Sequence, residues 1–385
     1  MPENGIYLDH QATTPVDERV LEAMMPYFTE VYGNAASNDH FFGVEANKAV
    51  SEARETLADA IGAKPDEIIF TSGATESDNI AILGVAERYA DQGKHIITCV
   101  TEHKAVLDPC KELEERGWNV TYLPVDSTGM VDPDDVREVI GPETVLISIM
   151  AANNEVGTIA PIEEIGAIAA EHDVFFHTDA AQAVGHIPVN VKDMNIHLMS
   201  FTAHKCYGPK GVGALYRRRS NPRVNIKPQI FGGGHERGIR SGTLNVPSIV
   251  GFGKAVELGI EGMHEENERY EAWTNRMFSL LQEKLGDVER NGHPTRRLPH
   301  NLNVFIPGVE SRALIVDLKN IAVATGSACT SADVEPSHVI TAMHDAQRAH
   351  SSIRVSVGRT NDKAHIDKAA DSIAKIAKEL RAFAL

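Results

Sequence analysis

The chain has 385 residues, of which 42% are hydrophobic, and its 54 acidic and 37 basic side chains give a formal net charge of −17 at pH 7. This length favours two domains, and no apolar run is long enough to cross a bilayer. The negative charge argues against direct binding to nucleic acid phosphates or to anionic lipid. The N-terminus lacks the basic and apolar regions of a signal peptide, so we expect a cytoplasmic protein.

The four cysteines, Cys99, Cys110, Cys206 and Cys329, show no metal-ligand spacing. We therefore expect no metal site, and no disulfide in a reducing compartment. The first three lie in or beside apolar segments and are interpreted as small packing residues. Cys329 differs, because residues 325–336 are small and polar and end in a proline, which favours a loop with an accessible thiol.

The first 40 residues combine short elements with loops. A short apolar strand at 6–8 precedes a loop at 12–15, and a helix is expected from Asp17. Residues 32–37 are rich in turn-forming side chains, and loops carry many binding groups. Asn34 in this loop is therefore either a turn residue or a binding residue.

A candidate anion site follows the next strand. Residues 67–70 form an apolar run that leads into Thr71-Ser72-Gly73-Ala74-Thr75, after which apolar residues recur at helical spacing. A strand, a glycine turn and a helix start can receive a phosphate on backbone N–H groups at the positive end of the helix dipole. Thr75 would add a hydroxyl donor, or it could be only a helix N-cap.

Two further predicted strands are followed by polar candidates. His103 follows a strand at 96–100, and Asn154 follows a strand at 145–149. The second strand is almost entirely apolar, which is typical of a strand buried on both faces of a parallel sheet. Each side chain has a structural alternative, since a lone histidine and an asparagine are both common in turns.

Asp179 and Lys205 are the central pair of the sequence. Each follows a strand-like apolar segment, and a carboxylate and a lysine delivered from two strand ends suit pyridoxal phosphate (PLP). The lysine amine can form a Schiff base with the aldehyde, while the carboxylate keeps the pyridine nitrogen protonated. A helix cap and a surface lysine are the alternatives. The alternation of strands and helices over residues 66–218 predicts a parallel, doubly wound sheet with ligand groups at the carboxyl ends of its strands.

The C-terminal third begins with a glycine-rich segment at 232–243. It lacks the GK[ST] ending and the preceding strand of a nucleotide-binding loop. A long helical region is expected from 245 to about 285, interrupted near Gly259 and Gly262. The elements predicted beyond it are strands at 301–306 and 353–357 and an amphipathic helix at 366–380.

Several of these motifs resemble one known family. HTDAAQAVG, SFTAHKCYGPKGVGALY and GGGHERGIRSGT are similar to the corresponding segments of NifS/IscS cysteine desulfurases, and the likeness extends from LDHQATTP to SSIRVSVGR. It implies an α/β protein with the PLP-dependent transferase fold type I. A large domain at 15–258 would hold a mostly parallel seven-stranded sheet flanked by helices. Residues 1–14 and 259–385 would form a smaller α+β domain that carries the cysteine loop.

The resemblance also implies roles for individual residues. Lys205, Cys329 and His103 would be catalytic, and His103 would stack on the PLP ring. Asn34 would bind the substrate's carboxylate. Independently of the resemblance, the planar guanidinium of an arginine suits a bidentate contact with that carboxylate, and Arg354 is the candidate, with Arg359 as the second choice. A structural ion pair is the alternative role of both arginines. The residues implied to bind the cofactor are Ala74, Thr75, His103, Asn154, Asp179, Gln182, Thr202, His204, Lys205 and Thr243.

The implied reaction converts L-cysteine to L-alanine. The thiolate of Cys329 in the GSACTS segment would take the substrate's sulfur as a persulfide. Acceptors would be an iron–sulfur scaffold protein and carriers for tRNA thiolation. The protein would be a homodimer in which Thr243 reaches the neighbouring subunit's PLP phosphate. We expect the tail with which IscS proteins dock the scaffold to be short or absent here, and docking to be weaker or built differently.

Two other functions are alternatives to this one. Another PLP enzyme of the same fold, such as a small-substrate aminotransferase or a selenocysteine lyase, would keep Asp179 and Lys205 but would not need Cys329 in a long loop. A non-catalytic assembly factor would be expected to have lost the lysine, the aspartate or the loop cysteine. All three residues are present.

Overall fold

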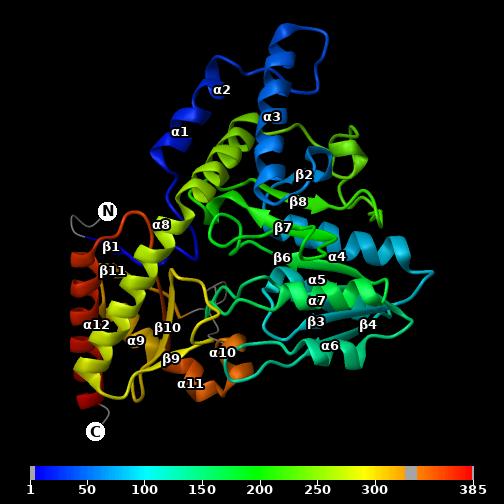
Figure 1. The fold of residues 1–385 in the computed structure, drawn as a ribbon. Helices are drawn as coiled ribbons and strands as arrows, with labels where there is room; N and C mark the ends of the chain where they lie inside the picture. Colours follow the sequence, from blue (N-terminus) through cyan, green and yellow to red (C-terminus); the bar gives the residue numbers. More distant parts are fainter. Residues whose placement is uncertain (1–4, 326–335, 384–385) are drawn as a thin grey trace.

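The computed structural model describes residues 5–325 and 336–383. Its largest element is a seven-stranded sheet in the order β2-β8-β7-β6-β5-β3-β4 (Figure 1). The strands are β2 (Ile68–Thr71), β3 (His95–Cys99), β4 (Asn119–Leu123), β5 (Thr144–Ser148), β6 (Phe175–Asp179), β7 (Leu198–Thr202) and β8 (Gly213–Arg217). The α/β class and the mostly parallel seven-stranded sheet are therefore confirmed.

One strand departs from the parallel arrangement expected over residues 66–218. β8 runs antiparallel to both of its neighbours, β2 and β7. Only ten residues separate Thr202 from Gly213, and a parallel return requires a crossover of a dozen or more residues. The short connection therefore forces β8 to reverse.

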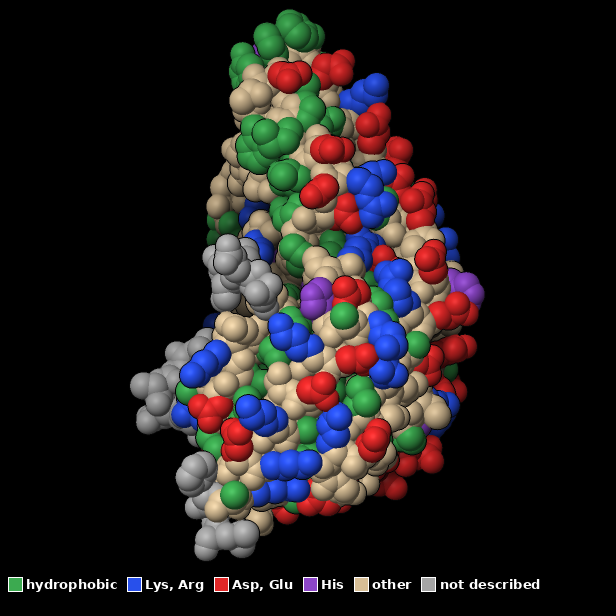
Figure 2. Space-filling view, turned by 90° about the vertical axis from the view of Figure 1, so that its left-hand side faces the viewer, with side chains coloured by type: hydrophobic (Ala, Val, Ile, Leu, Met, Phe, Trp, Pro, Cys, Tyr) green, Lys and Arg blue, Asp and Glu red, His purple; other side chains and the backbone are tan. Residues whose placement is uncertain are grey.

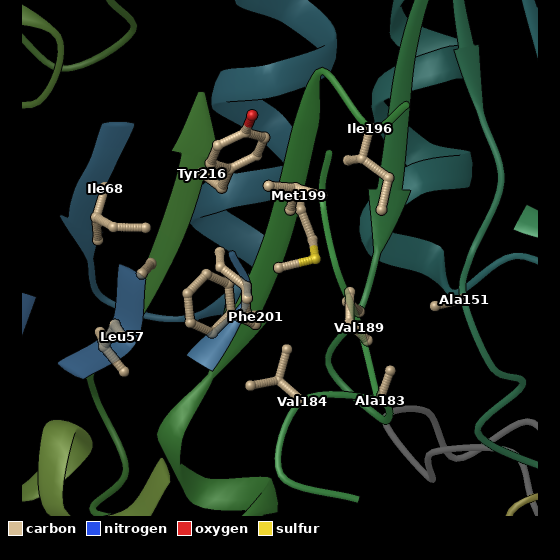
Figure 3. Packing of buried hydrophobic residues seen from close by; sticks show 14 of the residues in the cluster. Leu57, Ile68, Ala151, Ala183, Val184, Val189, Ile196, Met199, Phe201 and Tyr216 are labelled. Carbon is tan, nitrogen blue, oxygen red and sulfur yellow. The ribbon is translucent and has the colours of Figure 1, made fainter. Parts of the chain in front are cut away.

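Helices cover both faces of this sheet. One face carries α3 (Phe41–Ala60), α7 (Ile162–Glu171) and the first half of α8 (Val246–Leu285). The other carries α4 (Ala74–Tyr89) and α5 (Lys104–Glu115). Figure 3 shows part of the first of these cores, with Met199 and Phe201 of β7 and Tyr216 of β8 among its buried side chains. The remaining helices of the large-sheet half of the molecule are α1 (Glu18–Met24), α2 (Pro26–Thr29) and α6 (Pro133–Val139).

A second, smaller core lies around an antiparallel sheet in the order β12-β10-β9. Its strands are β9 (Glu289–Asn291), β10 (Asn301–Phe305) and β12 (Ser352–Ser356), and β1 (Ile6–Tyr7) pairs nearby with β11 (Ile321–Ala322). The accompanying helices are α9 (Ser311–Asp317), α10 (His338–Met343), α11 (Ala346–His350) and α12 (Lys363–Phe383). The predicted assignment of residues 1–14 and 259–385 to one small domain is consistent with these pairings but remains a prediction.

The helix α8 links the two cores, and it is continuous (Figure 1). The expected interruption near Gly259 and Gly262 is therefore wrong. A β-carbon at Gly259 would lie 3.1 Å from the backbone of Gly185. Gly259 thus serves close packing of the helix, because tertiary contact outweighs the modest helix propensity of glycine. No helix within the described ranges is both long and apolar enough to span a membrane.

Candidate active site

The candidate site lies at one edge of the large sheet. β2, β3, β5, β6 and β7 all point the same way, so their carboxyl ends meet at that edge. The segments that leave these strands carry, in turn, Thr75, His103, Asn154, Asp179 and Lys205. Residues predicted separately from five strand ends are thus brought together by the parallel topology.

Asp179 ends β6 and is only 6% exposed. Its Oδ1 accepts a hydrogen bond of 2.9 Å from the backbone N–H of Ala181, so the cap-like alternative is partly realised. In the described part of the chain the carboxylate has no ion-pair partner. Burial raises the pKa of Asp179, while the nearby His103 and Lys205 lower it. A buried carboxylate without a cation fits the protonated ring nitrogen of PLP.

Lys205 lies in the short turn that follows β7 and is half-buried, unlike an ordinary surface lysine. Its Nζ donates to the backbone carbonyls of Gln11 and, at 3.0 Å, Ala12. Burial lowers the pKa of Lys205 to about 8, and the positive charge of Arg354 acts in the same direction. A substantial fraction of the side chain is therefore a neutral amine near pH 8, which is the nucleophilic form.

The start of α4 offers a phosphate seat. Gly73 is the N-cap and provides no side-chain acceptor, so the alternative that Thr75 is the cap is wrong. Thr75 is exposed in the first turn, next to backbone N–H groups that the helix leaves unpaired. The hydroxyl of Thr202 lies 3.9 Å from where a β-carbon of Gly73 would be. Two hydroxyls and a helix N-terminus form a donor set that fits a phosphate.

The close approach of strands behind this seat depends on Gly213. A β-carbon at Gly213 would lie 2.7 Å from the backbone of Gly73. Any larger residue in β8 would therefore push the turn before α4 away from Thr202, whose hydroxyl donates to Val212 O at 3.2 Å.

His103 caps α5, and its Nδ1 accepts a hydrogen bond of 3.1 Å from the N–H of Ala105. The neutral ring must then carry its proton on Nε2. The ring is exposed to solvent, yet the protein atoms around it lower its pKa by desolvation. It borders a cavity of about 380 Å³ that is also lined by Thr75 and Asn79. A larger cavity of about 500 Å³, near Asp126, includes none of the strand-end candidates.

Three further predicted ligands are Gln182, His204 and Asn154. Gln182 Nε2 donates to the carbonyl of Gln11 at 3.1 Å, and His204 Nδ1 lies 3.1 Å from Thr13 Oγ1. Burial lowers the pKa of His204 to about 4, so the ring is neutral at pH 7. Asn154 receives a hydrogen bond from Arg354 only on its backbone carbonyl, which leaves its amide for other use.

Arg354 lies on β12 and is 4% exposed. Its Nη2 pairs with Asp9 Oδ1 at 2.7 Å, and its Nη1 donates to the carbonyl of Asn154 at 2.7 Å. These contacts occupy two of the five N–H donors of the guanidinium. The alternative arginine, Arg359, forms an ion pair with Glu266 at 2.6 Å, as a structural residue would.

Asn34 and Thr243 do not join the cluster within this chain. Both are exposed, and neither hydrogen-bonds to the other predicted site residues in residues 5–325 and 336–383. Asn34 Oδ1 accepts a hydrogen bond from Ala36 N at 3.0 Å, as a turn residue would. Cys329 lies outside the described residues. Cys99, Cys110 and Cys206 are buried, as predicted.

Sequence reasoning missed three residues near the lysine and the aspartate. Gln11 presents the carbonyl that Lys205 and Gln182 share. Glu102 is fully buried, and Asp78 lies 3.5 Å from His177 Nε2. Burial and the neighbouring Asp179 raise the pKa of both acids.

Only one of these three residues left a readable signal in the sequence. Asp78 is a charged residue one turn after Thr75, on a helix face that otherwise packs against the sheet. Residues 5–325 and 336–383 contain no cluster of potential metal ligands.

Comparison with known proteins agrees with this geometry. Residues 6–369 match the family model "Aminotransferase class-V". The chain is 52% identical to "Cysteine desulfurase IscS" of Anaeromyxobacter dehalogenans over 98% of this chain and 93% of that protein. Among solved structures, a "NIFS-LIKE PROTEIN" matches with a TM-score of 0.91, at 39% identity over 97% of this chain and 100% of the other.

A further solved structure, "SspA in complex with cysteine", has a TM-score of 0.81 and 40% identity over 91% of this chain and 98% of the other. The family match covers nearly the whole chain, and the relatives share half of its residues. The chain therefore belongs to the class-V aminotransferase family and, within it, to the PLP-dependent cysteine desulfurases.

Proposed function

We propose that this cysteine desulfurase moves the sulfur of L-cysteine onto Cys329 and leaves L-alanine. The observation that carries the proposal is the placement near Lys205 of the buried Asp179, which has no ion-pair partner in residues 5–325 and 336–383. Burial lowers the pKa of Lys205 to about 8. Cysteine itself is the ligand named in the structure of the relative SspA. The proposed setting is the cytoplasm, where free thiols persist.

The cofactor would be held from three directions. Asp179 would hold the proton on its ring nitrogen, and the start of α4 with Thr75, Thr202 and His204 would bind its phosphate. The residues proposed to line the rest of the ring are His103, Asn154, Gln182 and Ala74. Bound PLP would supply an electron sink for the carbanion at the substrate's Cα.

The chain's own groups would move the protons and the sulfur. The Lys205 amine is the proposed base at Cα, and His103 Nε2 is the proposed second proton carrier. The Cys329 thiolate would attack the substrate's sulfur, so that an S–S bond forms and the Cβ–S bond breaks. The electron pair of the broken bond stays on carbon, which a proton converts to the methyl group of alanine.

The substrate's carboxylate is assigned to Arg354. Replacing Arg354 by alanine should raise the KM for L-cysteine at least about thirtyfold, because a buried charge-pair contact is worth about 2 kcal/mol or more. Steady-state kinetics at saturating PLP would measure this. Arg359→Ala is the matched control, since Arg359 is tied to Glu266 and Asp17. An unchanged KM in Arg354→Ala would remove Arg354 from the substrate site.

We also propose a homodimer in which Thr243 completes the partner's phosphate seat. Figure 2 shows hydrophobic side chains gathered at the tip of the molecule, over α1, α2 and the start of α3. The exposed large hydrophobic residues on and between these helices are Leu21, Met25, Phe28, Tyr32, Phe41, Phe42 and Val44. An apolar surface of this kind commonly marks a protein interface. Phe231, in the segment before Thr243, is a further large hydrophobic side chain on the surface and is 78% exposed.

Hybrid dimers test this arrangement. Lys205→Ala and Thr243→Glu should each be nearly inactive, the second because its carboxylate repels the phosphate. After the two variants are unfolded together and refolded, about a quarter of the sites would combine an intact Lys205 with an intact Thr243 from the partner. Recovery of about a quarter of wild-type alanine release is expected. No recovery beyond the separate variants would place Thr243 in its own chain's site.

The proposed sulfur acceptors are an iron–sulfur scaffold protein and other sulfur carriers. The activity itself is tested by incubating the PLP-loaded protein with L-cysteine and quantifying alanine and sulfide. The expected result is one alanine formed for each cysteine consumed. Amino transfer to a keto acid, without alanine from cysteine, would instead indicate an aminotransferase.

A further inference from the structure

Gln11 lies where the two halves of the molecule meet, and it is 1% exposed. Its backbone carbonyl accepts hydrogen bonds from Lys205 Nζ and from Gln182 Nε2. Both donors belong to the large-sheet side of the site. The neighbouring carbonyl of Ala12 is the second acceptor for Lys205, at 3.0 Å.

The other groups of Gln11 are held by the small sheet. Its backbone N–H donates to Ser356 Oγ of β12 at 2.9 Å, and its Oε1 accepts from Asn301 Nδ2 of β10 at 2.5 Å. Its Nε2 has no partner among the described residues. The side chain is therefore anchored through its oxygen alone, and one contact with Asn301 fixes it.

Asn301 is itself rigidly placed. Its Oδ1 accepts from Arg297 Nη2 at 2.9 Å, and its Nδ2 also donates to Glu155 O at 3.0 Å. A β-carbon at Gly157 would lie 2.6 Å from this amide, which shows how closely the chain packs around it. Asn301 can therefore act as a fixed support for Gln11.

We propose that Gln11 is a positioning residue, which uses Asn301 and Ser356 to hold two backbone carbonyls against the Lys205 amine. This inference rests on the proposed role of Lys205. It assigns the small sheet a part in setting both the place and the charge of the lysine. Gln11 need not touch the substrate, because it acts through Lys205.

The sign of the effect follows from the contacts. Carbonyl oxygens accept hydrogen bonds from an ammonium group and favour its charged form, whereas burial favours the neutral amine. A loosened Gln11 would leave the lysine enclosed but without one of its acceptors. The proton on Lys205 should then be lost at a lower pH than in the wild type.

The test uses the full chain freed of PLP, labelled between pH 6 and 10 with a water-soluble acetylating ester. Mass spectrometry of the peptide that contains Lys205 gives the pH midpoint of its labelling. Gln11→Ala and Asn301→Ala should each lower this midpoint by about one unit, as expected for losing a hydrogen bond to a charged group. The double variant should shift no further than either single one, since both changes break the same contact.

Asn303→Ala is the matched control. Asn303 lies on the same strand and also donates to Glu155 O, at 3.1 Å, but it does not touch Gln11. In Asn303→Ala the pH midpoint of Lys205 labelling should equal that of the wild type. This variant should also take up PLP at the wild-type rate, whereas Gln11→Ala should take up PLP about tenfold more slowly.

An unchanged or raised midpoint in Gln11→Ala, or additive shifts in the double variant, would overturn the proposal. If Gln11→Ala does not fold, Asn301→Ala decides the matter alone, by the same readout. Labelling needs no turnover, so it is independent of the desulfurase assay. A wild-type protein that releases no alanine would refute the proposed function and leave the labelling result standing.

Discussion

Replacing Cys329 by serine should reduce alanine release from L-cysteine at least about a thousandfold. A thiolate is a strong nucleophile toward sulfur, and a serine hydroxyl is neither ionised at pH 7 nor able to form a persulfide. The measurement is alanine per site under saturating L-cysteine, with PLP content checked by absorbance. The variant should keep its PLP, because the predicted cofactor ligands do not include Cys329.

Cys110→Ala is the control for this experiment. Cys110 is fully buried, and burial raises the pKa of its thiol to about 12, so it is protonated and inert at pH 7. Its replacement should leave alanine release near the wild-type value. Alanine release by Cys329→Ser at the wild-type rate would show that sulfur leaves by another route.

Lys205→Ala should lower alanine release by a similar factor of about a thousand or more. The variant loses the only group proposed to act as a base at Cα, and general acid–base catalysis with covalent attachment of the cofactor accounts for such factors. Single-turnover experiments with the PLP-loaded variant would measure the loss. The absorbance of PLP bound covalently to the protein should be absent.

Lys210→Ala tests whether this effect is specific to Lys205. Lys210 is an exposed lysine five residues further on. Its replacement should change neither the absorbance nor the rate. Covalently bound PLP in the Lys205→Ala protein would show that another lysine forms the attachment.

Much of the fold could be predicted because buried strands were readable as apolar runs. The strands predicted at 67–70, 96–100 and 145–149 lie within one residue of β2, β3 and β5. The reversal of β8 was not predicted, since direction depends on the length of the connection after β7. The continuity of α8 was missed for a related reason. Glycines near Gly259 weaken a helix in isolation, but here packing against Gly185 holds it together.

The site was predictable to the extent that its side chains stand directly after strands. Asp179, Lys205 and His103 could be named because the end of a parallel strand is a defined place in the fold. Gln11 could not be named, because it contributes a backbone carbonyl and every residue carries that group. Glu102 was hidden for a similar reason, since only the folded structure shows that a carboxylate next to His103 is excluded from water.

The unbroken length of α8 has a consequence for how the protein melts. Phe252 and Val256 belong to the core of the large sheet, while Met277 and Leu281 belong to the core of the small one. Neither core can release its part of the helix without loosening the other, so the two should unfold as one cooperative unit. Cofactor bound at the edge of the large sheet should therefore protect the C-terminal strands from denaturation as well.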